Sequence, residues 1–200
     1  MDQLHPYGFL SESYDTERLK TLTVWSEFSD PDMDSRIAPY ARTPREHMVH
    51  QCLSEDTWMR SMLGVQSSRP ALPPEEDRLS FIRHYGDVSS ERLDTIRAKR
   101  TDWWQDPVAF FDVTRTRAWV FVRRLTHSAH HRGQLTMCLR HLGKPLYSTY
   151  GPTADTGGLP AHGARTIYRY GSIGDLMDAE ARGGAWPSLP GPQRAPTERP

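Results

Sequence analysis

The longest uninterrupted helical pattern in this chain runs from Thr116 to Leu142, with no proline and one glycine. Its apolar residues recur at spacings of three and four, which is the period of an amphipathic helix. They are Val120, Phe121, Leu125, Leu135, Cys138, Leu139 and Leu142. The pattern therefore predicts one helix of about seven turns that packs one face against the rest of the protein.

Two histidines belong to this helix. At about 100° per residue, His131 falls within the apolar stripe and His127 lies at its edge, one turn earlier. Neutral imidazole is the commonest protein ligand for transition metals, and an i, i+4 pair can converge on one ion. The alternative is two ordinary hydrogen-bonded polar residues, and these residues alone leave both interpretations open.

Two strings carry a resemblance to a known family. His127-x-x-x-His131-Arg132-Gly133-Gln134 resembles the signature on the last helix of the DinB-like superfamily, named after DNA-damage-inducible proteins. The stretch 46–58, Glu-His-Met-Val-His-Gln-Cys-Leu-Ser-Glu-Asp-Thr-Trp, is similar to the family's second-helix motif of a histidine followed by a tryptophan. The resemblance spans about residues 8 to 170. It implies a four-helix bundle in which three histidines bind a divalent metal.

Carried over to this sequence, the three metal ligands are His50, His127 and His131. His47 lies one turn before His50 and is an alternative, but the distance to Trp58 favours His50. The periodicity of this helix points the other way, because its sulfur-containing stripe lies roughly opposite His50. That stripe is Met48, Cys52, Met59 and Met62. One resolution is that both faces are covered, with the polar face lining a pocket.

The fold class expected is all-α: a DinB-like four-helix bundle with a short helical or loop insertion before helix four and an irregular C-terminal segment. The helices are predicted at 9–28, at 44–64, from Pro73–Asp77 onward and at 116–142, with a short helix at 172–182. Residues 102–111 form the insertion, an aromatic cap on one end of the bundle. Residues 1–185 are expected to form the metal-binding domain, and the proline-rich residues 186–200 a disordered tail.

Composition and charge limit the binding partners and the cellular compartment that can be expected. The 25 basic and 25 acidic residues cancel, so net charge favours neither nucleic acid nor an anionic membrane. The two cysteines, Cys52 and Cys138, are far apart in sequence, which favours a reducing compartment. The first residues lack signal-peptide features, and no apolar run reaches membrane-spanning length. We therefore expect a cytoplasmic protein. As a DinB-like bundle, it is expected to be a homodimer that acts on a small molecule.

Three histidines leave an open coordination position, as in catalytic sites. Some relatives in the DinB-like superfamily use a low-molecular-weight thiol such as bacillithiol, mycothiol or glutathione, so the resemblance implies a thiol-dependent S-transferase or isomerase holding zinc or nickel. The alternatives are a metal-dependent hydrolase and a non-catalytic metal- or ligand-binding stress protein. No catalytic residue is assigned. Further candidates are Gln134 to orient His131, Arg124 to hold a substrate carboxylate or to pair with a carboxylate of the bundle, and Asp155 or Tyr150 to reach the metal pocket.

Overall fold

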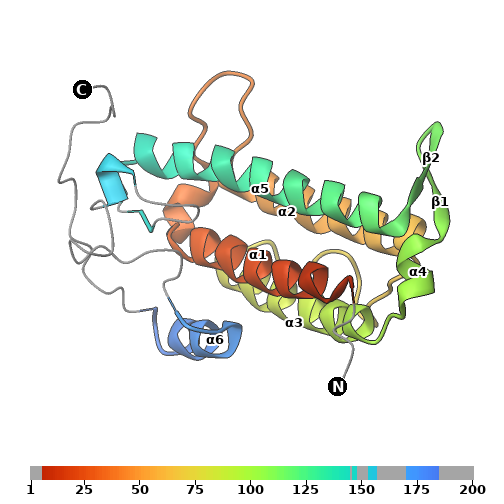
Figure 1. Ribbon diagram of the computed structural model, residues 1–200. Helices are drawn as coiled ribbons and strands as arrows, with labels where there is room; N and C mark the ends of the chain where they lie inside the picture. Colours follow the sequence, from red (N-terminus) through yellow and green to blue (C-terminus); the bar gives the residue numbers. More distant parts are fainter. Residues whose placement is uncertain (1–5, 145, 148–152, 157–169, 185–200) are drawn as a thin grey trace.

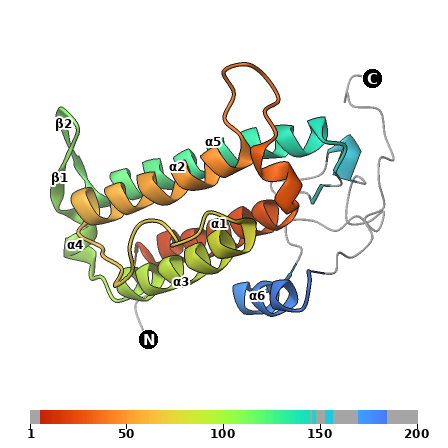
Figure 2. The ribbon, with the colours of Figure 1, turned by 180° about the vertical axis from the view of Figure 1, so that it is seen from behind.

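The computed structural model describes residues 6–144, 146–147, 153–156 and 170–184. Four long helices run alongside one another (Figure 1), and the reverse view again shows α2 beside α5 and α1 beside α3 (Figure 2). They are α1 (Gly8–Ser26), α2 (Pro44–Thr57), α3 (Arg78–Arg97) and α5 (Arg117–His141). The predicted all-α four-helix bundle is confirmed.

Helix α2 begins where its capping residues predict. The Thr43 hydroxyl accepts a hydrogen bond from the Glu46 backbone N–H at 3.2 Å, and the Glu46 carboxylate accepts one from the Thr43 N–H at 2.8 Å. The helix continues into a π-helical segment, η2 (Trp58–Leu63), and ends at Gly64, whose φ of 66° is the left-handed value that glycine adopts readily. The predicted range of 44–64 is therefore correct, and His50 is placed two turns inside it.

Helix α3 begins later than predicted. Asp77 is its N-cap, and the Asp77 carboxylate accepts a hydrogen bond from the Ser80 N–H at 2.9 Å. The stretch Pro73–Glu76 therefore precedes the helix, and the prediction that it forms the first turn was wrong. Proline and acidic residues suit a first turn, but an aspartate that satisfies a free backbone N–H is the stronger start signal.

The insertion before α5 contains more than the predicted helix or loop. A short helix, α4 (Thr101–Gln105), is followed by an antiparallel hairpin of β1 (Pro107–Phe110) and β2 (Val113–Thr116). Trp104 is buried and packs edge-on against Phe121 with ring centroids 5.2 Å apart. Phe111, at the turn of the hairpin, is 72% exposed. The aromatic cap is thus confirmed for Trp104, while Phe111 projects into solvent.

The buried apolar residues form two clusters along the bundle. One surrounds Trp25 and Phe81, and the other surrounds Trp104 and Phe121. Helix α5 is held against α1 by an ion pair between Arg132 and Glu17. Arg132 is 1% exposed, and its guanidinium reaches across to the neighbouring helix.

The C-terminal part adds one described helix, α6 (Ile173–Ala181), close to the predicted 172–182. Ser172 caps it, and it packs on α3 where Gly86 leaves room: a Cβ there would lie 3.4 Å from the Met177 sulfur. Most of the predicted irregular segment, including Tyr150, and the predicted tail 186–200 lie outside the described residues. No helix in the part of the chain that the structure describes is long and apolar enough to cross a membrane.

Candidate metal centre

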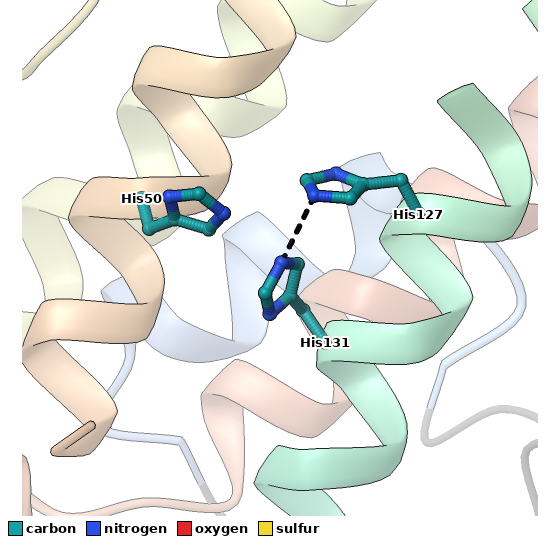
Figure 3. A group of neighbouring side chains, drawn as sticks. All are labelled: His50, His127 and His131. Carbon is teal, nitrogen blue, oxygen red and sulfur yellow. Dashed lines mark hydrogen bonds between the residues drawn. The ribbon is translucent and has the colours of Figure 1, made fainter. Parts of the chain in front are cut away.

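Three histidines meet between α2 and α5. His50 comes from α2, and His127 and His131 come from successive turns of α5 (Figure 3). The Nε2 atoms of His127 and His131 are 3.1 Å apart, and one ligand atom from each of the three rings lies within 4.8 Å of the others. The His50 and His131 ring centroids are 4.5 Å apart. The structure thus brings together the three residues that the family resemblance implied.

The position of His50 explains the conflict in the periodicity of α2. Met48, Cys52 and Met59 are buried in the core, as their spacing predicted. His50 is nevertheless partly buried, because α5 runs along that flank of α2 and supplies His127 and His131 opposite it. The periodicity identified the most buried face of α2, but it could not show that a second helix covers the adjoining flank. His50 also lines a surface cavity of about 420 Å³ on α2.

The hydrogen bonding of His131 leaves the lone pair of one ring nitrogen available to a metal ion. It is 4% exposed, and its Nδ1 lies 2.8 Å from the side-chain oxygen of Gln134. Because that oxygen can only accept, Nδ1 carries the ring proton and Nε2 has the free lone pair. This tautomer is the one needed for coordination through Nε2, and a hydrogen bond at the other nitrogen typically orients metal-binding histidines. The predicted role of Gln134 fits this geometry.

His127 is fixed by two neighbours. Its ring stacks on Trp58, with centroids 5.5 Å apart and planes inclined by 18°. An Nη atom of Arg124 lies 2.8 Å from His127 Nδ1, and a guanidinium can only donate. The neutral ring therefore carries its proton on Nε2 and donates it to His131 Nε2. A cation that binds His127 through Nε2 requires the ring proton to move to Nδ1, so Arg124 must then give up its hydrogen bond to that nitrogen.

The third ring supplies a test of whether a cation fits. His50 Nε2 is buried and has no hydrogen-bond partner in the part of the chain that the structure describes. An unpaired buried polar atom costs free energy, which coordination of a cation would recover. Zinc–nitrogen bonds of 2.0–2.1 Å place tetrahedral ligand nitrogens about 3.4 Å apart. The His127–His131 pair already meets this spacing, and His50 needs only a small approach. The donor set therefore fits a divalent transition metal.

Electrostatics keeps these rings neutral. Burial and then the neighbouring His127 lower the pKa of His131 to about 3. Burial and then the Arg124 charge lower the pKa of His127 to about 4. Burial also lowers the pKa of His50. All three are deprotonated at neutral pH, which is the form that coordinates metal.

Arg124 does not lie free in the pocket. Its guanidinium pairs with Glu55 at 3.2 Å and donates to the Ser54 hydroxyl at 3.0 Å, and its side chain is 1% exposed. Of the two predicted roles, the structure supports the pairing with a bundle carboxylate. Arg124 nevertheless touches His127, so it links the metal centre to the interior of the bundle.

Glu55 accepts four buried hydrogen bonds at the centre of the bundle. It was not identified from the sequence. It is 0% exposed and receives hydrogen bonds from all three other long helices. The donors are Tyr14 at 2.7 Å, Tyr85 at 2.8 Å, Arg92 at 3.4 Å and Arg124 at 3.2 Å. Burial raises the pKa of Glu55, but Arg124 and Arg92 outweigh burial and hold that pKa below its usual value. The available signal was a charged residue at a buried helical position one turn before Trp58.

Asp155 does not reach the histidines. It pairs with Arg140 near the end of α5. His47, the alternative ligand on α2, lies beside His131 with ring centroids 5.5 Å apart but is not part of the group of converging ligand atoms. Among the described residues, that group consists of His50, His127 and His131 alone.

Known proteins share this architecture. A crystal structure of a DinB-like protein from Bacillus cereus matches with a TM-score of 0.60 and 19% identity, covering 70% of this chain and 95% of that one. A DinB-like protein from Bacillus subtilis matches with a TM-score of 0.56 and 14% identity, covering 68% and 92%. No curated protein matches the chain. The DinB family model matches residues 6–158, which include all three histidines. The chain belongs to the DinB family.

Proposed function

We propose that this protein is a metal-dependent enzyme that uses a low-molecular-weight thiol, as an S-transferase or isomerase, with the divalent ion held by His50, His127 and His131. The observation that carries the proposal is the convergence of three neutral imidazoles without a fourth ligand among the described residues. Structural sites are usually closed by four protein ligands, whereas catalytic sites use three and leave a position open.

The charge of the ligand set favours an anionic partner. Three neutral rings leave the full charge of a divalent ion uncompensated, and the nearest charged side chain, Arg124, is also positive. A divalent ion such as zinc or nickel supplies Lewis acidity, which lowers the pKa of a bound thiol so that it reacts as the thiolate.

The chain's own residues hold this arrangement rigid. Gln134 orients His131, and Trp58 stacks on His127. Arg124 fixes His127 from behind and is itself fixed by Glu55, which joins the four long helices. Such support positions the ligand nitrogens and leaves the open side of the site for the reacting molecules.

The hydrolase alternative requires a group that accepts a proton from water. Glu55 is the acidic residue closest to this role in the described network, but four donors already occupy it and its pKa is lowered. This disfavours Glu55 as a general base, since such a base works best with a pKa near the operating pH. A non-catalytic binding protein would be favoured by a fourth protein ligand.

Cobalt-substituted protein tests the proposal. Adding bacillithiol, mycothiol or glutathione should produce a sulfur-to-metal charge-transfer band, with affinity rising toward the pKa of the thiol. The band should persist when Cys52→Ala is combined with Cys138→Ala, because both thiols are buried and the pKa of each is raised by burial. Turnover of an electrophile should then require both metal and thiol.

The other outcomes separate the alternatives. Thiol-independent hydrolysis of esters or amides, with no band from any of the three thiols, would contradict the proposal in favour of the hydrolase. Metal binding without a band or turnover would leave the binding protein.

A further inference from the structure

A second cavity, of about 360 Å³, adjoins the metal centre on the side away from Glu55. It lies between the segment 37–42, which precedes α2, and the last turns of α5. Two of its lining residues touch His131: Gln134 through a hydrogen bond and His47 through its ring. The cavity is thus one side chain away from the proposed metal site, and its size suits a small metabolite, given that ligand pockets run from about 300 Å³ upward.

One positively charged side chain that lines the cavity, Arg42, forms no ion pair with the described residues. Arg42 is exposed, and it also has no hydrogen bond to any residue that the structure describes. The Arg42 charge helps to lower the pKa values of both His47 and His50, which places it within electrostatic reach of the site. Arg36, six residues earlier, is by contrast already paired with Glu46 at 2.7 Å.

One residue that lines the cavity, His47, has a buried ring nitrogen without a hydrogen-bond partner among the described residues. His47 is 4% exposed, and this nitrogen is its Nδ1. Leaving such a nitrogen unpaired costs free energy, which a ligand in the cavity can recover. His47 is also the helix-two histidine that the metal cluster does not use, so its burial beside the site calls for another explanation.

None of the residues that the structure describes around this cavity is acidic. Its other side chains are apolar, aromatic or sulfur-containing, apart from Gln134, and burial keeps the Cys138 thiol neutral by raising its pKa. The cavity beside His50 differs in charge, because Glu46 and Glu76 line it together with Arg45. The cavity beside His50 thus has a mixed charge, whereas an anion that approaches through the second cavity meets only the positive charge of Arg42 among the described residues.

We propose that the cavity between residues 37–42 and α5 binds the carboxylate of a small molecule, with Arg42 as its charged partner and His47 Nδ1–H as a second donor. This makes the substrate class of the enzyme a carboxylate, on the thiol or on the molecule that it attacks. The catalytic meaning rests on the proposed function, but the binding itself does not require metal.

Two probes test the binding. Succinate, which has no thiol, should bind the metal-free protein saturably in calorimetry. N-acetylcysteine should bind cobalt-substituted protein at least about tenfold more tightly than its methyl ester, a difference of about 1.4 kcal/mol, because the ester removes the charge that pairs with Arg42. The Arg42→Gln variant should lose both effects while retaining full cobalt content. Arg123→Gln is the matched control, because Arg123 is also exposed and acts on His127 but does not line the cavity.

His47 gives a second variant. His47→Leu should weaken succinate binding several-fold, whereas His47→Asn, which keeps a donor near the position of Nδ1, should largely restore it. Circular dichroism of both variants verifies that the fold is intact.

The outcomes are distinguishable. Succinate binding that depends on Arg42, without an acid–ester difference, would assign the carboxylate to the acceptor molecule. A difference in both arms would assign it to the thiol as well. Protein that binds cobalt but neither takes up succinate nor distinguishes acid from ester would overturn the cavity proposal and leave the metal proposal standing. Failure to bind cobalt would overturn the metal proposal, and the succinate arm would still decide this one.

Discussion

Replacing Glu55 with glutamine should destabilise the protein strongly. The substitution keeps the shape of the side chain but removes the negative charge that two buried arginines share. Arg92 retains a second carboxylate, Asp56, at 2.7 Å. Arg124 has no other acidic partner among the described residues, and its remaining contacts are Ser54, the Gln51 carbonyl and His127.

The expected size follows from these contacts. Removing one partner of a buried ion pair costs about 3–5 kcal/mol, because the other charge remains buried without compensation. The new amide also turns its NH₂ group toward donors, so at least one of the four existing hydrogen bonds is lost. Since Arg92 keeps Asp56, we expect about 3 kcal/mol, a large part of the roughly 5–15 kcal/mol that stabilises a typical domain. For a chain of this size that corresponds to a fall of about 6–12 °C in Tm.

Guanidinium unfolding of metal-free protein, followed by far-ultraviolet circular dichroism, measures the effect. The control is Glu12→Gln, which removes a carboxylate from an exposed position of α1 and should change the free energy of unfolding by less than about 0.5 kcal/mol. The double variant Glu55→Gln with Arg124→Gln should lose less than the sum of the two single variants, because the second change removes the uncompensated charge. A loss below about 1 kcal/mol for Glu55→Gln would refute the reasoning, since it would mean that the network is effectively solvated.

Gly133→Ala should stabilise the protein by about 0.5–1 kcal/mol without changing metal content, since a Cβ there meets no atom within 4 Å; unfolding curves would contradict this if stability fell. In metal-free protein, the free energy of unfolding should be at its full value above pH 6.5 and should fall toward pH 4. The reason is that the histidines of the unfolded chain take up protons first, since the folded pKa values of His47, His127 and His131 lie at about 4, 4 and 3. His131→Gln should flatten this pH dependence, and an unchanged slope would count against the prediction. Light scattering should give about 46 kDa for the expected homodimer, twice the 22.9 kDa of one chain, and a mass of one chain would contradict it.

The bundle could be predicted because its signals are local. The spacing of apolar residues marked α5, and the Thr43–Glu46 capping box marked the start of α2. The hairpin before α5 escaped prediction because its turn is formed by Phe111 and Asp112 and lacks the usual glycine. Phe111 has a φ of 53°, which a bulky residue seldom adopts.

The site was predictable in part. His127 and His131 share a face of one helix, so their spacing alone brought them together, whereas His50 required the family resemblance because its neighbour is a different helix. The Glu55 network depends on four helices meeting at one point, and no spacing along the chain encodes that. The same holds for the cavity of Arg42 and His47, whose walls come from segments about ninety residues apart.

The central claim is that His50, His127 and His131 hold one divalent ion, and metal content of the purified protein tests it most directly. Elemental analysis should give about one zinc or nickel per chain, and alanine in place of any of the three should lower it strongly. His47→Ala and His130→Ala, which change histidines beside the cluster, should leave it unchanged. Full occupancy in His131→Ala, or loss in His47→Ala with retention in His50→Ala, would contradict the account.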